Sequence, residues 1–374
     1  MCKSENLEMF LDLGFIPKVD RFLIKGELNE PETLYPLTVH LCIECGLAQL
    51  GYIIPDHELF DENYAYEAST TKTRHENHNQ LAESVCNRFS IEKNSFVVDI
   101  GSNVGMLLEC FKNKGMKVLG IDASANIAEK ANSKGIETIL GFFNQEIVTE
   151  IKNTKGLASV ITATNVFAHI QDYQSFIIAL KNLLKDKGVF VFQVPHFLTL
   201  LKNIEYDTIY NEHISYFGLK PLIKFFEKNQ MELFDVVETE IDGGSIRCFV
   251  SNKGMHTISD NIKRILDKEE EEGVYSIKKL IEFAKKVKNQ KNELNQLLLE
   301  LKRGGKSVVG VGAPAKGITM INYCKIDEDI LEYITEKAPL KIGKFAPGMH
   351  IPIGTPAQLK KDNPNVIHII GIRS

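Results

Sequence analysis

The stretch VVDIGSNVGMLLECF, residues 97–111, followed by VLGIDAS, residues 118–124, decides the fold of this chain. An apolar run ends in a glycine-containing turn, an amphipathic segment follows, and a second apolar run ends in an acidic residue. This order predicts strand, loop, helix and strand, the opening of a nucleotide-binding α/β domain. Gly101 and Gly105 would let the loop backbone approach a ligand, and Asp122 would accept hydrogen bonds from ribose hydroxyls. An ordinary tight turn remains the alternative, because this glycine spacing is common.

Strands and helices continue to alternate downstream, which predicts a mostly parallel, doubly wound sheet. The expected elements are helices at 73–89, 124–134 and 172–185, one more helix ending near 154, strands at 137–140, 188–195 and just before 164, and a hairpin of 233–241 with 244–252. Ligands of such sheets bind beyond the carboxyl ends of the strands. The residues expected at that edge are Gly101, Asp122, Asn165, His169 and Gln193.

Composition narrows the function. The 374 residues are enough for two or three domains, and the formal net charge of −5 gives no electrostatic reason to expect nucleic acid or an anionic membrane as a partner. No apolar run approaches the roughly 20 residues needed to cross a bilayer. The N-terminal MCKSENLEM lacks the regions of a signal peptide, so we expect a cytoplasmic protein with reduced thiols.

The first 66 residues are expected to be loop-rich, because prolines interrupt short apolar pieces. Within them Cys42 and Cys45 have the C-x-x-C spacing of half a zinc site, although two buried thiols would give the same pattern. Cys2 could supply a third ligand. The candidates for a fourth ligand are Glu5, His40 and His57.

An insertion follows the fifth strand and contains Tyr210, Glu212 and His213 within four residues. A histidine oriented by a carboxylate is a competent general base near neutral pH. A surface turn with a capping glutamate would use the same residues.

The last third of the chain repeats the glycine-loop pattern. Residues 256–304 show apolar spacings near 3.6 residues and predict helices. SVVGVGAPAKGITMINY, residues 307–323, then predicts a second Rossmann-like unit, in which a helix N-terminus and Lys316 could hold a phosphate. KIGKFAPGMHIPI adds a loop with two further lysines, Lys341 and Lys344.

Taken in order, these stretches resemble the nucleotide-sugar C-methyltransferases of deoxysugar biosynthesis. The segments that carry the resemblance are FLDLGFIPKVDRFL, YPLTVHLCIECGLAQL, VVDIGSNVGMLLECF, TNVFAHIQD, YDTIYNEHISYF, DGGSIR, GVGAPAKGITMINY and KIGKFAPGMHIPI. The resemblance implies an α/β fold with a Rossmann-like core that uses S-adenosylmethionine. It further implies a zinc-binding domain at 1–66, a methyltransferase domain at 67–252, and a Rossmann-like domain at 253–374 that binds the nucleotide sugar.

The resemblance also implies roles for single residues. Those of the cofactor site are Gly101, Asn103, Gly105, Asp122, Ala123 and Asn165. Those that contact the sugar nucleotide are Asn165, His169, Lys316 and Lys341. Those of catalysis are His213 as the base, Glu212, Tyr210, His169, and Tyr64 in preference to Tyr66. Those of a structural Zn²⁺ are Cys2, Cys42, Cys45 and Glu5. The substrate would be a dTDP- or GDP-linked keto-deoxysugar, and the enzyme a monomer.

Two departures from the family pattern concern ligands. The first family C-x-x-C corresponds here to Cys2 and Glu5, so a site of four thiolates is not expected. The residue before the G-G-S-x-R turn, commonly histidine in the family, is Asp242, so a sugar contact would differ.

The implied reaction is methylation of the carbon beside a ketone, where a base removes a proton and hydrogen-bond donors stabilise the enolate. We expect His213, oriented by Glu212, to be that base. An O-methyltransferase of a nucleotide sugar or glycan is the alternative enzyme, and a non-catalytic zinc-containing nucleotide-binding module is the alternative of another class. An NAD-dependent oxidoreductase would need Glu336 as the ribose partner of the second glycine loop.

Overall fold

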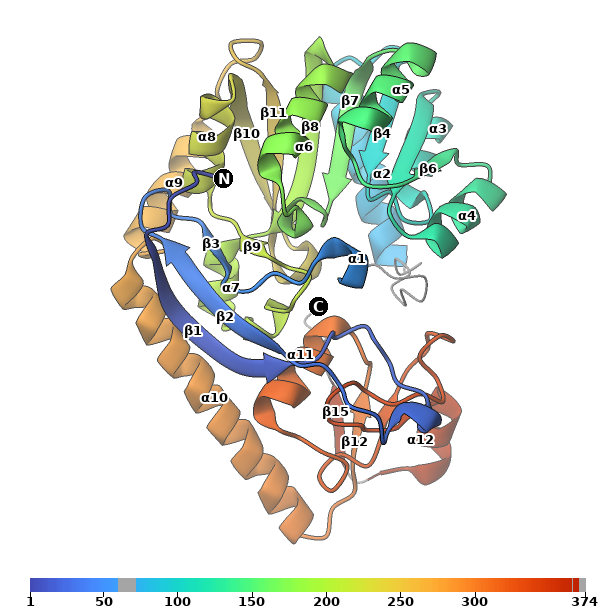
Figure 1. Cartoon of the computed structure of the whole chain (residues 1–374), viewed down its shortest axis with the longest axis vertical. Coiled ribbons are helices and arrows are strands. Elements are labelled where there is room, and N and C mark those ends of the chain that lie inside the picture. Colours follow the sequence, from blue (N-terminus) through green and yellow to red (C-terminus); the bar gives the residue numbers. More distant parts are fainter. Residues whose placement is uncertain (60–71, 365, 370–374) are drawn as a thin grey trace.

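The computed structural model describes residues 1–59, 72–364 and 366–369, and the described residues form three sheets, of which the first takes its last strand from within the middle part of the chain (Figure 1). None of the described helices is both long and apolar enough to cross a membrane. The N-terminal sheet and the C-terminal unit lie below the large middle sheet in the view of Figure 1. Helix α10 (Ile277–Arg303) runs beside both of them.

The N-terminal sheet has the strand order β1-β2-β3-β9, with every neighbouring pair antiparallel. Its strands are β1 (Leu7–Ile16), β2 (Tyr35–Cys42), β3 (Ala48–Leu50) and β9 (Ser215–Tyr216), and the helices beside it are η1 (Lys25–Glu27) and α1 (Asp56–Leu59). The expectation of a loop-rich N-terminus is therefore wrong. β2 alternates strictly, with Leu37, Val39 and Leu41 buried and the residues between them partly exposed, which is the pattern of a strand with one covered face.

The middle sheet has the order β10-β11-β8-β7-β4-β5-β6. The strands β4 to β8 are parallel, and the hairpin of β10 and β11 is joined to β8 through an antiparallel β11, as predicted. The strands are β4 (Phe96–Ile100), β5 (Lys117–Asp122), β6 (Thr138–Leu140), β7 (Ala158–Thr164), β8 (Leu184–Pro195), β10 (Met231–Thr239) and β11 (Ser245–Asn252). Strand β8 begins earlier than predicted because Leu184 pairs with Ala158 across a register shift.

Helices cover both faces of the middle sheet. Helices α2 and α3 pack on one face, and α5, α6 and α8 pack on the other. The helices of this part are α2 (Lys72–Arg88), α3 (Met106–Asn113), α4 (Ala125–Ser133), α5 (Gln145–Lys155), α6 (Tyr173–Leu183), α7 (Phe197–Asn203), α8 (Leu219–Lys228) and α9 (Asp260–Glu271), with short turns η2 (Phe167–His169), η3 (Tyr206–Thr208) and η4 (Ile241–Gly243).

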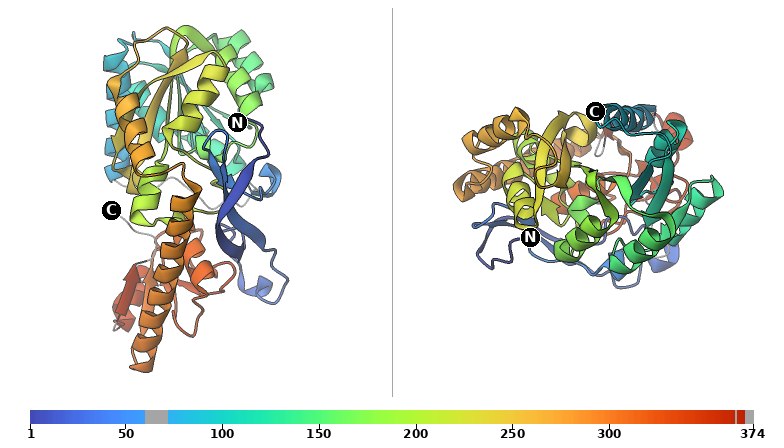
Figure 2. Two further views of the ribbon diagram at one scale, coloured as in Figure 1. Left: turned by 90° about the vertical axis from the view of Figure 1, so that its left-hand side faces the viewer. Right: turned by 90° about the horizontal axis from the view of Figure 1, so that it is seen from above.

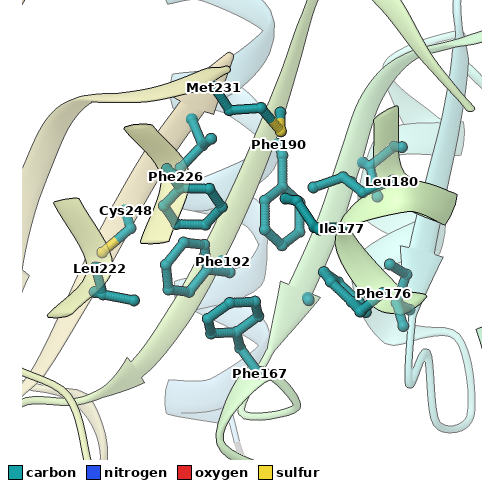
Figure 3. Packing of buried hydrophobic residues seen from close by; sticks show 14 of the residues in the cluster. Phe167, Phe176, Ile177, Leu180, Phe190, Phe192, Leu222, Phe226, Met231 and Cys248 are labelled. Atoms are coloured by element: carbon teal, nitrogen blue, oxygen red, sulfur yellow. The ribbon is translucent and has the colours of Figure 1, made fainter. Parts of the chain in front are cut away.

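An aromatic cluster anchors the loop that follows β7. Phe167 is fully buried, and its ring centroid lies 4.5 Å from that of Phe192 (Figure 3). The rings of Phe176, Phe190 and Phe226 surround the same side chain. Because dense packing resists displacement, the backbone on either side of Phe167 is fixed in place at the carboxyl edge of the sheet.

The C-terminal unit is a parallel sheet with the order β14-β13-β12-β15. Its elements are β12 (Val308–Val311), α11 (Ala315–Cys324), β13 (Ile334–Thr335), β14 (Ile353–Gly354), α12 (Pro356–Asp362) and β15 (Val366–Ile369). The second strand–glycine–helix unit is thereby confirmed, whereas β14 within the proline- and glycine-rich loop was not predicted. Figure 2 shows α10 standing alongside this unit.

Candidate active site

The glycine loop after β4 has positive φ angles at positions where the sequence has glycine or asparagine. Gly101 has φ 63°, and a Cβ atom there would lie 2.3 Å from a methyl group of Val166. Asn103 also has a positive φ, 49°, a conformation that asparagine tolerates better than most residues. Gly105 has φ 82° and precedes α3, where a Cβ would meet Ile136 at 2.7 Å. Gly105 therefore shapes the loop and does not line the cavity described below.

Asp122 ends β5 and is tied to the same loop. Its carboxylate accepts hydrogen bonds from the backbone N–H of Asn103 at 2.8 Å and of Ser124 at 3.0 Å. Burial raises the pKa of this carboxyl, and the two N–H donors oppose that rise. The arrangement fixes an acceptor pair at the wall of the cavity, where ribose hydroxyls could donate to it.

A cavity of about 360 Å³ opens at this edge of the middle sheet. It gathers six of the residues expected at the cofactor or substrate site, namely Gly101, Asn103, Asp122, Ala123, Asn165 and His169. Other members of its wall were not predicted from the sequence, namely Arg74, His78, Asp99, Phe142, Phe143 and Asn144. The run GFFN directly follows β6, and its place at the carboxyl end of a parallel strand could have indicated it.

Asp99 lies beneath the glycine loop on β4. It is buried, and the hydroxyl of Thr162 donates to its carboxylate at 2.6 Å. Burial raises the pKa of Asp99 to about 7, so a proton on this carboxyl is available near neutrality. Its place in the cavity wall puts it under the loop that a bound cofactor would touch.

The loop after β7 brings Asn165 and His169 to the cavity. Asn165 has φ 58°, its backbone N–H donates to the carbonyl of Gln193 at 2.9 Å, and its side-chain N–H donates to the carboxylate of Asp242 at 2.8 Å. His169 is buried, and burial lowers its pKa to about 4. Its imidazole is therefore neutral at physiological pH.

His213 and Tyr210 form a hydrogen-bonded pair in the insertion after β8. The Nδ1 atom of His213 lies 2.9 Å from the carbonyl oxygen of Thr208, and its Nε2 atom lies 2.8 Å from the hydroxyl oxygen of Tyr210. A carbonyl only accepts, so Nδ1 carries the proton and Nε2 accepts from the tyrosine. Burial lowers the pKa of His213 well below 6.5, and the neighbouring His169 and Lys316 lower it further. His213 is therefore a neutral base with its acceptor nitrogen turned to Tyr210.

This geometry corrects the role predicted for Glu212. The ring nitrogens of His213 contact Thr208 and Tyr210, so these two groups, and not Glu212, set the orientation of the imidazole. Glu212 is itself buried beside the pair. The rings of His213 and His169 lie 5.0 Å apart, which places the pair next to the cofactor cavity. Tyr64 lies outside the described residues.

The lysines of the C-terminal unit differ in their surroundings. Lys316, in the first turn of α11, donates to the backbone carbonyl of Asp242 at 3.3 Å and so reaches the middle domain. Lys341 is buried, where its ammonium group donates to the carbonyl of Ala313 at 2.9 Å and lies 3.3 Å from the carboxylate of Asp20. Lys341 thus supports the second glycine loop through its hydrogen bond to the Ala313 carbonyl.

Glu336, at the end of β13, repeats the arrangement of Asp122. Its carboxylate accepts from the backbone N–H of Ala313 in the second glycine loop at 2.9 Å, and from Ala338 two residues downstream at 3.2 Å. The second unit therefore presents a carboxylate, tied to its glycine loop, at the position that contacts ribose in dinucleotide folds.

A thiol cluster lies at the end of the N-terminal hairpin. The Sγ atoms of Cys2, Cys42 and Cys45 all lie within 4.8 Å of one another, and those of Cys2 and Cys42 are 3.5 Å apart. Sulfurs bound to one zinc ion at about 2.3 Å in a tetrahedron would be about 3.8 Å apart, so the three thiols fit the ion. Glu5 is exposed and is not a member of this cluster among the described residues, so the structure does not support it as the fourth ligand.

Family models match nearly the whole chain. The model described as "Putative zinc binding domain" matches residues 1–60, "Methyltransferase domain" matches 73–236, and "C-methyltransferase C-terminal domain" matches 240–372.

Two curated proteins show similarity of different extent. The C-methyltransferase NovU of Streptomyces niveus is 34% identical over 359 residues, which cover 96% of this chain and 85% of that protein. A ubiquinone biosynthesis O-methyltransferase of Rhodopseudomonas palustris is 25% identical over 118 residues, or 30% of this chain and 47% of that protein. Among solved structures, an S-adenosylmethionine-dependent methyltransferase from Clostridium acetobutylicum has a TM-score of 0.38 and 16% identity, covering 48% of this chain and 92% of that one.

Proposed function

The chain belongs to the family of S-adenosylmethionine-dependent C-methyltransferases that includes NovU, and on that premise we propose that it methylates the carbon next to the ketone of a nucleotide-linked 4-keto-deoxysugar, with C-3 as the preferred position. The observation that carries the proposal is the buried, neutral imidazole of His213, hydrogen-bonded to the partly buried Tyr210 beside the cofactor cavity. A carbon nucleophile needs such a base, because the proton beside a ketone is only weakly acidic.

The cavity residues would hold the cofactor, which supplies an electrophilic methyl group when bound. Asp122 would accept hydrogen bonds from the ribose hydroxyls. The backbone of Gly101 to Asn103 would lie against the ligand, since Val166 leaves no room for a Cβ at Gly101. Asn165, fixed by Gln193 and Asp242, would contact the part of the ligand that lies across β4.

The base would be the Nε2 atom of His213. The substrate ketone would draw the Tyr210 hydroxyl away from Nε2, which then accepts the α-proton while the Tyr210 O–H donates to the enolate oxygen. The electron pair of the broken C–H bond would pass into the enolate, and the carbon would form the new C–C bond with the methyl group as the methyl–sulfur bond breaks and leaves its electron pair on sulfur. Positioning contributes much of the rate, because effective molarities for aligned reactants reach about 10⁵ M or more. His169 and Tyr64 would be further hydrogen-bond donors to the enolate oxygen or to nearby hydroxyls of the sugar.

The second glycine loop would hold the nucleotide of the sugar. The carboxylate of Glu336 supports this assignment because it stands where a pentose hydroxyl would donate. Lys316 would attract the diphosphate, since it lies in the first turn of α11 and reaches the loop of Asp242. The partner would be dTDP- or GDP-linked, and the enzyme a cytoplasmic monomer, which size-exclusion chromatography with light scattering can test.

Solvent exchange tests the base directly. With cofactor omitted, the wild-type enzyme should exchange deuterium into the carbon next to the ketone of its sugar, and His213→Asn should exchange at least 100-fold more slowly. Tyr210→Phe retains the imidazole but removes the donor to the enolate oxygen, so we expect an intermediate rate. Exchange by His213→Asn at the wild-type rate would show that another group is the base.

The similarity to an O-methyltransferase over 118 residues supports one alternative, methylation of a hydroxyl by the same site. Product NMR separates the two, because a C–CH₃ signal and an O–CH₃ signal differ in chemical shift. A mass-spectrometric screen of thymidine- and guanosine-linked 4-keto-6-deoxyhexoses for a gain of one methylene unit would identify the substrate.

A further inference from the structure

The strands that flank β4 define the two ends of the cofactor cavity. Strand β5 lies on one side of β4 and β7 lies on the other. Asp122 ends β5, and the aromatic pair Phe142 and Phe143 follows β6 beyond it, so a ribose at Asp122 would place its base over that pair. The amino-acid end of S-adenosylmethionine, with its carboxylate, would then extend across β4 toward β7.

A single permanently cationic side chain lines the cavity among the described residues. Arg74, near the start of α2, is the one arginine or lysine in the wall, which otherwise includes the carboxyl groups of Asp99, Asp122 and Asp172. Acidic groups favour the sulfonium and ammonium groups of the cofactor, but they repel its carboxylate. Among the described residues of the wall, Arg74 is therefore the one side chain that offers this carboxylate a permanent positive charge.

Asp242 places this arginine at the β7 end. Its carboxylate lies 2.9 Å from Nη2 of Arg74 through one oxygen, and accepts from the side chain of Asn165, directly after β7, through the other at 2.8 Å. The side chains of Arg74 and Asp242 are each 22% exposed, so the ion pair is partly shielded from water. A guanidinium can bridge two carboxylates because its N–H donors point in several directions.

We propose that Arg74 binds the carboxylate of the cofactor's amino-acid part, and that Asp242 is the positioning residue that holds the guanidinium toward it. This assigns a role to Asp242 in place of the sugar contact expected at that position. The proposal rests on the cofactor alone and is independent of the sugar substrate, so a failure of the proposed sugar chemistry leaves it standing.

The test compares two ligands by isothermal titration calorimetry on the full chain. S-adenosylhomocysteine carries the carboxylate, and S-adenosyl-3-thiopropylamine is the same molecule without it. Arg74→Gln should weaken S-adenosylhomocysteine by about 10- to 100-fold, the range of a hydrogen bond to a charged group, and change the decarboxylated analogue by about twofold or less. Arg74→Lys, which keeps a point charge, should recover part of the affinity.

Control variants separate binding from folding. Arg88→Gln removes a different ion pair of α2, in which Arg88 lies 2.6 Å from Asp235, and should leave both ligands unaffected because Arg88 does not line the cavity. Asp242→Asn keeps an acceptor for Asn165 and should weaken only S-adenosylhomocysteine, by less than Arg74→Gln; it also serves if Arg74→Gln does not fold. Equal losses for both ligands, or none for S-adenosylhomocysteine, would overturn the proposal.

Discussion

At the scale of the residue, the site depends on protonation states set by burial. His213 is buried and keeps its imidazole neutral, with Nδ1–H donating to the Thr208 carbonyl and Nε2 left as the acceptor. A surface histidine would lose half of its base form near pH 6.5. Burial moves that loss to lower pH and so widens the pH range over which His213 could act as the proposed base.

The pH profile of kcat/KM follows from this. A lowered pKa means that protonation, which removes the base, occurs only below the ordinary value of 6.5. We expect kcat/KM to stay near its plateau as pH falls from 8 to 6.5 and to decline below that. Steady-state assays over pH 5 to 9 measure it. An acid limb centred at or above pH 6.5 would mean that His213 is not the titrating base in the free enzyme.

Gly101 offers a second prediction at this scale. Gly101→Ala adds a methyl group against Val166 at a φ of 63°, whereas Gly135→Ala, at φ 76°, meets no atom within 4 Å. The control should lose only the left-handed strain, about 1–2 kcal/mol of unfolding free energy, with an unchanged affinity for S-adenosylhomocysteine. Gly101→Ala should lose more stability in urea titrations and bind the ligand at least tenfold more weakly. Equal behaviour of the two variants would contradict a close approach at the loop.

At the scale of the element, the thiol cluster joins the hairpin of β1 and β2 to the turn before β3. Cys45→Ser should release the zinc, because it removes one of the clustered ligands. Cys110→Ser is the control, since Cys110 is buried elsewhere, on α3. Plasma mass spectrometry should find about one zinc per chain in the control and much less in Cys45→Ser. Glu5→Ala should keep its zinc. Loss of zinc from this variant would show that Glu5 is a ligand.

The sequence predicts an element well where one local pattern of residues identifies it. It predicts poorly the features that depend on contacts between residues distant in the chain. The glycine loop and Asp122 were identified because strand, turn and acidic residue are adjacent in the chain. The N-terminal sheet was missed because its prolines suggest loops, whereas β2 alternates and pairs with β1 across a long loop. Arg74 was missed because its ion pair with Asp242 joins residues far apart in sequence. Tyr210 was named beside His213, but the sequence does not show that its hydroxyl and the Thr208 carbonyl, and not Glu212, contact the imidazole.

At the scale of the whole molecule, buried polar contacts tie the domains together. Glu269 on α9 is fully buried; its carboxylate accepts from the backbone N–H of Leu219, lies 2.7 Å from Nε2 of His196, and accepts from the hydroxyl of Tyr275. These partners come from α8, from the residue after β8, and from the segment before α10. One carboxylate thus joins the middle sheet to the helices that lead into the C-terminal unit.

Removing this carboxylate should loosen the molecule as a whole. Glu269→Ala leaves several buried polar groups unsatisfied, and we expect the free energy of unfolding to fall by about 3–5 kcal/mol. The adjacent Glu270→Ala breaks an exposed pair with Lys220 and should cost about 0–1 kcal/mol. Urea titrations followed by circular dichroism compare the two. A small effect of Glu269→Ala would show that water replaces the carboxylate.

The pairing of β3 with β9 has a consequence for the synthesis of the protein. Strand β9 is formed by residues 215 and 216, directly after the insertion that holds Tyr210 and His213, and it completes the sheet that the first fifty residues begin. Domains generally fold in order as the ribosome releases them. Here the N-terminal sheet keeps an open edge at β3 until most of the middle domain has been translated, so its completion is coupled to the placement of the segment that holds Tyr210 and His213.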